Sequence, residues 1–212
     1  MTPSPEERAT GALVGTRVGD ALAMPVHWYY DRKYIDGDFD GGVTGYESPR
    51  HPHPESFMVG MSYEPDVSKA KSLGRPYDIL HDHLRFYKTN YSKLHIRRSE
   101  REGPHGNAVP ALDERYHYHH GLTAGENTLG AQLVRVLLRS VVERETYDPE
   151  HFITRFVEYL ATPGSNRDPY LEIYLRRWFE AYTRGADIYS AADHQRRTWS
   201  IGSLGGRSEE HT

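Results

Sequence analysis

The stretch RATGALVGTRVGDALAMPVHW, residues 8–28, decides the fold, because its spacing predicts one long helix with an unusual face. Gly11, Gly15 and Gly19 recur every fourth residue and therefore line one side of that helix. Each glycine inside a helix costs up to about 1 kcal/mol relative to alanine. Three glycines in register indicate that another backbone or a ligand approaches this face closely. The apolar flank beside them consists of Leu13, Val14, Val18 and Leu22.

Both ends of this first helix are marked in the sequence. Ser4, Pro5 and Glu7 match a capping box with proline at the first helical position. Pro25 lacks the backbone N–H that a helix interior needs, so we expect the helix to end there.

Helices also account for the chain after Gly125. Apolar residues at intervals of three and four predict a helix from residue 129, and Asp-Pro pairs at 148–149 and 168–169 predict the starts of two more. Because every well-patterned element is a helix, the expected fold class is all-α. The three apolar faces contain Leu129, Leu133, Val134, Leu137, Leu138, Val141 and Val142; Phe152, Ile153, Phe156, Val157 and Leu160; and Leu171, Leu175, Trp178, Phe179 and Tyr182.

Residues 31–122 separate the first helix from the others. The clusters DGDFDGG, SPRHPHP and EGPHGN are rich in turn-forming residues and interrupt any regular pattern. Residues 77–87 fit either a short helix or a strand. A connection of this length is normally functional or partly disordered, so we expect a long loop-rich segment after the first helix.

Composition excludes several classes of function. The 212 residues are 37% hydrophobic and 26% charged, with a net charge of −4, which argues against a nucleic-acid partner. No apolar run approaches the roughly 20 residues of a membrane helix, and the N-terminus is no secretory signal. The chain has no cysteine, which excludes disulfides and thiolate metal sites and fits a reducing, cytoplasmic location.

Residues 125–128, Gly-Glu-Asn-Thr, precede the second predicted helix and allow two interpretations. In the first, Asn127 or Thr128 caps the helix and Glu126 complements its dipole. In the second, the carboxylate, amide and hydroxyl oxygens bind a hard cation such as Mg²⁺. The local pattern alone favours capping.

Histidines offer a second candidate site. His117 and His119 are two residues apart, so in an extended chain they point the same way, and His81 and His83 repeat that spacing. These imidazoles could bind zinc, iron or nickel, but no HExxH motif or other fixed spacing accompanies them. No G-x-S-x-G elbow, P-loop or G-x-G-x-x-G motif is present either.

Two segments together resemble the ADP-ribosylglycohydrolase family. Residues 8–28 look like its opening helix, which typically reads G-x-x-x-G-x-x-x-G-D-A-x-G-x-P-x-E, and residues 125–128 fall where the family carries Thr-Asp-Asp-Thr before a long helix. The resemblance implies an orthogonal helical bundle. It also implies a hydrolase that uses two Mg²⁺ ions to cleave an N- or O-glycosidic bond of an ADP-ribosylated or related small-molecule substrate.

Carried over by position, the family's metal-binding threonine and aspartates become Gly125, Glu126 and Asn127, while Thr128 matches. The resemblance thus makes Glu126 the expected catalytic residue, and Glu126, Asn127 and Thr128 the expected metal ligands. Because one ligand is missing and another is neutral, His117 and His119 are expected to supplement the metal shell.

The expected substrate-binding residues come from the same carry-over. The family's mobile glutamate becomes His27, and the aspartate of Gly-Asp-Ala becomes Asp20, whose role we expect to be structural as well. The expected substrate-binding set is Gly19, Asp20, His27, Gly125 and Ser203.

The C-terminal metal motif of the family, Asp-x-Asp-Ser/Thr, has no counterpart after the third predicted helix. The last six residues, RSEEHT, match one translated frame of a sequencing-library adapter. We therefore expect residues 1–206 to form a single incomplete domain and residues 207–212 to be a non-native tail. On this basis the 212-residue chain alone is expected to be inactive.

Three functions stay open at this point. The first is an ADP-ribosylglycohydrolase-like, metal-assisted hydrolase. The second is a non-catalytic member of the same fold, kept for binding or structure, as the lost ligands would allow. The third is a histidine-metal enzyme on that scaffold acting on another glycoside or nucleoside. Fold resemblance by itself does not choose among them.

Overall fold

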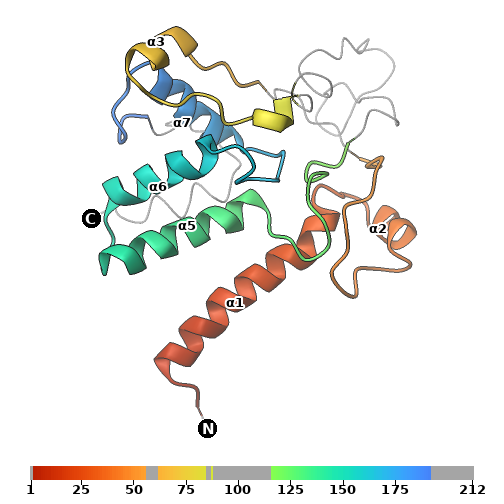
Figure 1. Cartoon of the computed structure of the whole chain (residues 1–212). Coiled ribbons are helices and arrows are strands. Elements are labelled where there is room, and N and C mark those ends of the chain that lie inside the picture. The colour runs from red at the N-terminus through yellow and green to blue at the C-terminus, as the bar shows by residue number, and fades with distance from the viewer. Residues whose placement is uncertain (1, 56–61, 85–86, 88–115, 192–212) are drawn as a thin grey trace, which may run out of the picture. The chain divides into compact units, whose positions relative to one another are not determined.

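The computed structural model describes residues 2–55, 62–84, 87 and 116–191, and within them every regular element is a helix (Figure 1). The predicted all-α class is confirmed. None of the described helices is long and apolar enough to cross a bilayer. The elements are α1 (Pro5–Ala23), η1 (Met24–Val26), α2 (Arg32–Asp38), α3 (Val67–Ser72), η2 (His81–His83), α5 (Leu129–Arg144), α6 (Pro149–Ala161) and α7 (Ile173–Thr183).

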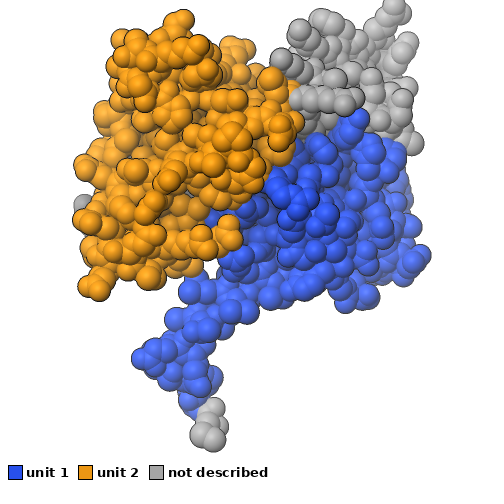
Figure 2. Space-filling model, in the orientation of Figure 1, with its two compact units in different colours: residues 1–59, 88–132, 167–169 blue, residues 60–87, 133–166, 170–212 orange. Residues whose placement is uncertain are grey.

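The chain divides into two compact units, shown in Figure 2. Unit 1 comprises residues 1–59, 88–132 and 167–169, and unit 2 comprises residues 60–87, 133–166 and 170–212. Unit 1 contains α1, η1, α2 and the start of α5. Unit 2 contains α3, η2, most of α5, α6 and α7.

Helix α1 begins as the sequence predicts. The Ser4 hydroxyl accepts from the Glu7 amide at 3.1 Å, and the Glu7 carboxylate accepts from the Ser4 amide at 2.7 Å, which completes a capping box. The helix ends at Ala23, and Pro25 lies in the following turn of 3₁₀ helix.

The glycine face of α1 departs from expectation. No described atom lies within 4 Å of the position that a Cβ would take at Gly11, Gly15 or Gly19. The flanking Val14 is 56% exposed, and Ala21 is the single buried residue of the helix in the described structure. The predicted close approach to this face is therefore not seen among the described residues.

The segment between the first and the later helices contains two short helices that the sequence did not predict. Asp31 caps α2 by accepting from the Lys33 amide, and Asp66 caps α3 by accepting from the Lys69 amide. Each helix is two turns or less, which is too short for apolar periodicity to become visible. Within residues 77–87, the described residues include the 3₁₀ turn η2, and Leu84 and Tyr87 are helical.

Unit 2 has a conventional helical core. In α6 and α7, the predicted apolar faces bury Phe156, Leu160, Leu175 and Phe179. In α5 the prediction was partly wrong: its buried face in this unit is formed by Leu133, Val136 and Ser140, whereas Val134 is 43% and Val142 77% exposed.

The start of α7 was also predicted incorrectly. The helix begins at Ile173, with Glu172 at the N-cap position, and not at the Asp168–Pro169 pair. Asp168 is instead fully buried in unit 1, where its carboxylate binds two other segments of the chain.

Candidate functional site

Two aspartates from distant parts of the sequence hold the start of α5. The first N–H groups of a helix have no partner inside the helix, and they favour negative charge. Asp20 Oδ2 accepts from the Thr128 amide at 2.8 Å, and Asp168 Oδ2 accepts from the Leu129 amide at 2.8 Å. The helix start is thus fixed by carboxylates from α1 and from the 167–169 segment.

Asp20 binds a second and a third atom there. Its Oδ1 accepts from the Thr128 hydroxyl at 2.6 Å, and its Oδ2 accepts from the Asn127 side-chain amide at 3.0 Å. Asn127 also donates to the Arg17 carbonyl at 2.7 Å. Asp20 therefore ties the end of α1 to residues 127–128, and this contact supports the structural role expected for it.

Glu126 closes the turn that precedes α5. Its Oε2 accepts from the Thr123 amide at 2.7 Å and from the Thr123 hydroxyl at 2.9 Å, and its Oε1 pairs with Arg167 Nη1 at 2.9 Å. Gly125 lies in the same turn with φ +82°, a conformation that favours glycine, and a Cβ added there would lie 3.7 Å from the Tyr46 ring. The predicted catalytic residue is thus engaged by the loop that carries it.

The imidazoles of four residues lie close together in unit 1, namely His27, His53, His117 and His119. The ring centroids of His53 and His117 are 5.1 Å apart, those of His117 and His119 are 5.8 Å apart, and those of His27 and His119 are 4.8 Å apart. His53, His117 and His119 are buried, whereas His27 is partly exposed.

Both nitrogens of His53 and His117 bind backbone atoms. His53 Nε2 lies 3.0 Å from the His27 carbonyl, and its Nδ1 accepts from the Glu55 amide at 3.0 Å. His117 Nε2 lies 3.1 Å from the Pro25 carbonyl, and its Nδ1 accepts from the His119 amide at 3.1 Å. A ring that donates with one nitrogen and accepts with the other is a neutral imidazole, so these two histidines brace the backbone.

His119 connects the buried aspartate to His27. Its Nδ1 lies 2.9 Å from Asp168 Oδ1, and its Nε2 lies 2.7 Å from His27 Nδ1. The three side chains form a continuous hydrogen-bonded row from the fully buried Asp168 to the partly exposed His27.

Burial disfavours the charged form of these imidazoles. It is the main reason that the pKa of His27 falls from 6.5 to about 4; the neighbouring His119 also lowers this pKa, whereas Asp20 and Asp168 raise it. Burial likewise lowers the pKa of His117 well below its usual value. Both rings are therefore neutral at pH 7.

The atoms expected to bind metal are largely committed within the protein. The Glu126 carboxylate binds Thr123 and Arg167, the Thr128 hydroxyl donates to Asp20, and both nitrogens of His117 and His119 have partners. In the described part of the chain, no group of three or more histidines, aspartates or glutamates is arranged to hold a metal ion. These residues do not fit the two-Mg²⁺ site that the resemblance implies.

The remaining predicted residues lie elsewhere or outside the described structure. His81 and His83 belong to unit 2, where each Nε2 binds a carbonyl, of Leu160 at 3.1 Å and of Asn166 at 3.0 Å. Gly19 has no described neighbour at its Cβ position, and Ser203 lies outside the described residues.

Sequence reasoning did not identify Asp168 and His53 as members of this cluster. Asp168 precedes a proline and therefore looks like a helix start, although its carboxylate caps α5 and not the helix that follows. His53 sits in a proline-rich stretch without periodicity. The spacing in the sequence gives no sign that either residue is buried.

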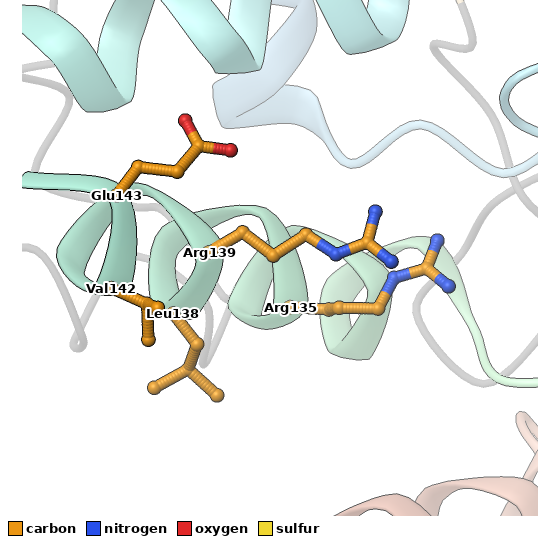
Figure 3. Close-up of a pocket in the computed structure, with 5 residues that line it drawn as sticks. All are labelled: Arg135, Leu138, Arg139, Val142 and Glu143. Carbon is orange, nitrogen blue, oxygen red and sulfur yellow. The ribbon is translucent and has the colours of Figure 1, made fainter.

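The pocket drawn in Figure 3 lies along one face of α5, in unit 2. Its volume is about 400 Å³, and all its lining residues belong to that helix: Arg135, Leu138, Arg139, Val142 and Glu143. Because one helix supplies all the lining residues, a ligand in this pocket would be contacted from one side only.

Comparison with known proteins identifies the family. The ADP-ribosylglycohydrolase family model matches residues 1–206. Curated proteins and solved structures gave no match. Because the family match spans nearly the whole sequence, and the all-helical fold agrees with it, the chain belongs to the ADP-ribosylglycohydrolase family.

Proposed function

We propose that this protein is a hydrolase that cleaves an N- or O-glycosidic bond of an ADP-ribosylated or related substrate. The family match over residues 1–206 carries this proposal, since the family is a hydrolase family. The polar cluster of Asp20, His27, His119, Asp168 and Glu126 in unit 1 supports it, because glycoside hydrolysis needs acid–base and hydroxyl-binding groups around one bond.

Glu126 stays the proposed catalytic carboxylate. Its side chain is 32% exposed and its partner Arg167 is 58% exposed. Exposed ion pairs are worth about 1 kcal/mol or less, so Glu126 can exchange Arg167 for a substrate or a cation at small cost. The family is typically metal-dependent, and measuring turnover with Mg²⁺ and with EDTA tests whether this protein needs a metal ion.

A second function, non-catalytic binding of an ADP-ribosyl group, is favoured by one specific observation. Asn127 is neutral and Gly125 has no side chain at positions where the family carries metal ligands. Such a protein would bind ADP-ribose without cleaving its linkage. Binding and turnover must therefore be measured separately.

The test compares the protein with its Glu126→Gln variant. Each is incubated with arginine-linked and serine-linked mono-ADP-ribosylated peptides, and the released ADP-ribose is measured by chromatography. Isothermal titration with ADP-ribose measures binding. Turnover that is lost in Glu126→Gln and kept in His51→Ala, the control at an exposed histidine, would support the proposal. Binding of ADP-ribose without turnover would favour the non-catalytic function.

A further inference from the structure

In the hydrogen-bonded row Asp168–His119–His27, the buried Asp168 determines which group donates in each hydrogen bond. A carboxylate contains only acceptor atoms, so the group at 2.9 Å from Asp168 Oδ1, His119 Nδ1, must donate. A neutral imidazole that donates with one nitrogen accepts with the other. His119 Nε2 is then an acceptor, and His27 Nδ1, 2.7 Å away, must donate to it.

By the same rule, the other ring nitrogen of His27, Nε2, is a hydrogen-bond acceptor. Once Nδ1 carries the proton, Nε2 of the neutral ring holds a lone pair. No described residue is hydrogen-bonded to His27 Nε2, and the side chain is partly exposed. In His53 and His117, by contrast, both nitrogens bind backbone atoms. Among these four imidazoles, His27 is therefore the one that presents an unused acceptor within the described structure.

The backbone around His27 holds this acceptor in place. The His27 carbonyl binds His53 Nε2, and the His27 amide donates to Met24 at 3.3 Å. Trp28 follows with φ +68°, an uncommon conformation for a side chain of that size, and its ring packs edge-on against the buried Tyr118 at 5.4 Å. Strained backbone that the surroundings enforce is typical of binding sites.

We propose that Asp168 and His119 fix His27 in its Nδ1–H form so that His27 Nε2 accepts a hydrogen bond from an O–H group of the reaction. The donor is either a sugar hydroxyl of the substrate or the water that attacks the glycosidic carbon. His27 is then the residue that touches the ligand, and His119 and Asp168 are positioning residues. This inference rests on the proposed function for the identity of the ligand, but the tautomer can be tested without it.

The first experiment measures the tautomer directly. Long-range ¹H–¹⁵N correlation spectra of the ¹⁵N-labelled chain, with His27 assigned from the His27→Gln spectrum, report which ring nitrogen carries the proton. We expect Nδ1 protonated and Nε2 unprotonated. Asp168→Asn can offer His119 an amide N–H in place of the carboxylate, so it should release the fixed tautomer. A protonated Nε2 in the wild type, or an unchanged tautomer in Asp168→Asn, would overturn the proposal.

The second experiment identifies the donor. The loss of one hydrogen bond should weaken the step that uses it by about tenfold. If His27 binds a sugar hydroxyl, His27→Ala lowers the affinity for ADP-ribose by that factor. If it binds the attacking water, ADP-ribose affinity is kept and kcat falls by that factor with KM unchanged. The control is His51→Ala, because the exposed His51 ring lies outside the row, with its centroid 4.3 Å from that of Tyr116.

The outcomes separate this inference from the proposed function. Unchanged affinity and unchanged kcat in His27→Ala would overturn the inference even if the wild type is an active hydrolase. ADP-ribose binding without turnover, weakened in His27→Ala, would contradict the proposed hydrolysis and support the inference. A wild-type protein that neither binds ADP-ribose nor hydrolyses an ADP-ribosyl bond would overturn both.

Discussion

The two units of this protein differ in their buried side chains: among the described residues the buried histidines lie in unit 1, whereas unit 2 buries mainly apolar side chains together with Arg176 and Glu180. In unit 2 the core is aromatic and aliphatic: Phe156 and Phe179 lie with ring centroids 5.5 Å apart, and Trp178 meets both at 5.2 and 5.1 Å. In unit 1 the buried residues include three imidazoles and a carboxylate, and their partners are largely backbone atoms and one another.

This difference in buried side chains bears on how each unit is stabilised and on which unit carries the function. Apolar burial is non-directional and proportional to area, so the core of unit 2 tolerates small shifts. A buried polar group costs free energy unless a partner is correctly placed, so unit 1 depends on geometry. Groups held in this way are also pre-positioned for a ligand, which supports locating the function in unit 1.

The largest loss of stability is expected from a substitution in the apolar core of unit 2. Phe179 is fully buried among Phe156, Trp178 and Tyr182. Phe179→Ala should lower the free energy of unfolding by about 4 kcal/mol, because it removes a large apolar side chain and leaves a cavity. Urea denaturation followed by circular dichroism measures this change.

The matched control is Val142→Ala on α5, since Val142 is 77% exposed. It should change the free energy by about 0.5 kcal/mol or less. Hydrogen exchange measured by mass spectrometry adds the location: Phe179→Ala should speed exchange in residues 149–183. Equal effects of the two variants would contradict the aromatic core of unit 2.

The second largest loss of stability is expected from a substitution among the buried polar residues of unit 1. Asp168→Ala removes the acceptor of both the His119 ring and the Leu129 amide and leaves two buried donors without partners. Each unsatisfied group costs about 1–3 kcal/mol, so we expect a loss of about 3 kcal/mol. Exchange should rise in residues 116–130. Asp168→Asn keeps a carbonyl acceptor and should cost less, and an equal loss in both variants would contradict the importance of the acceptor.

The third effect comes from a close approach between two loops of unit 1. A Cβ at Gly121 would lie 2.2 Å from the Arg167 carbonyl oxygen, so the backbone must move. Gly121→Ala should therefore destabilise the protein by about 2 kcal/mol, the range of an overpacked site, in a urea titration. Gly11→Ala is the control, because α1 leaves open space there, and it should stabilise the helix by up to about 1 kcal/mol. Stabilisation by both substitutions would show that the loops are further apart.

The same contrast explains what the sequence could predict. Apolar periodicity predicted α5 and α6 and the core residues of unit 2, and capping chemistry predicted the starts of α1 and α6, where Asp148 accepts from the His151 amide. These signals depend on neighbours within one helix. Periodicity failed for Val134 and Val142, whose exposure depends on which other elements pack against α5.

The candidate site could be predicted only in part. The Gly-Asp-Ala motif identified Asp20, near the end of α1, and His27, which directly follows η1. The partners of His27 lie far away in the sequence. His119, which contacts His27, is 92 residues away, and Asp168, which contacts His119, is 141 residues from His27. Local patterns contain no information on such pairings, and Asp168 was consequently mistaken for a helix start.

The smallest predicted effect is a pH dependence. The pKa of His27 is about 4 in the folded protein and about 6.5 when unfolded, so between these values the unfolded chain binds a proton that the folded chain does not. Stability from this group is complete above pH 6.5 and is lost as the pH falls, by about 1.4 kcal/mol per pH unit. The buried His117, whose pKa is also lowered, adds a loss of the same sign.

The contribution of His27 can be isolated by substitution. Urea titrations at pH values between 5 and 7 should show a slope in His27→Gln that is shallower than in the wild type by about 1.4 kcal/mol per pH unit. Ser4→Ala removes a helix cap but no titratable group, so it should lower stability by about 1 kcal/mol at every pH and keep the slope. An identical slope in His27→Gln and the wild type would mean that the folded His27 ring takes up its proton near pH 6.5, and that burial does not keep it neutral.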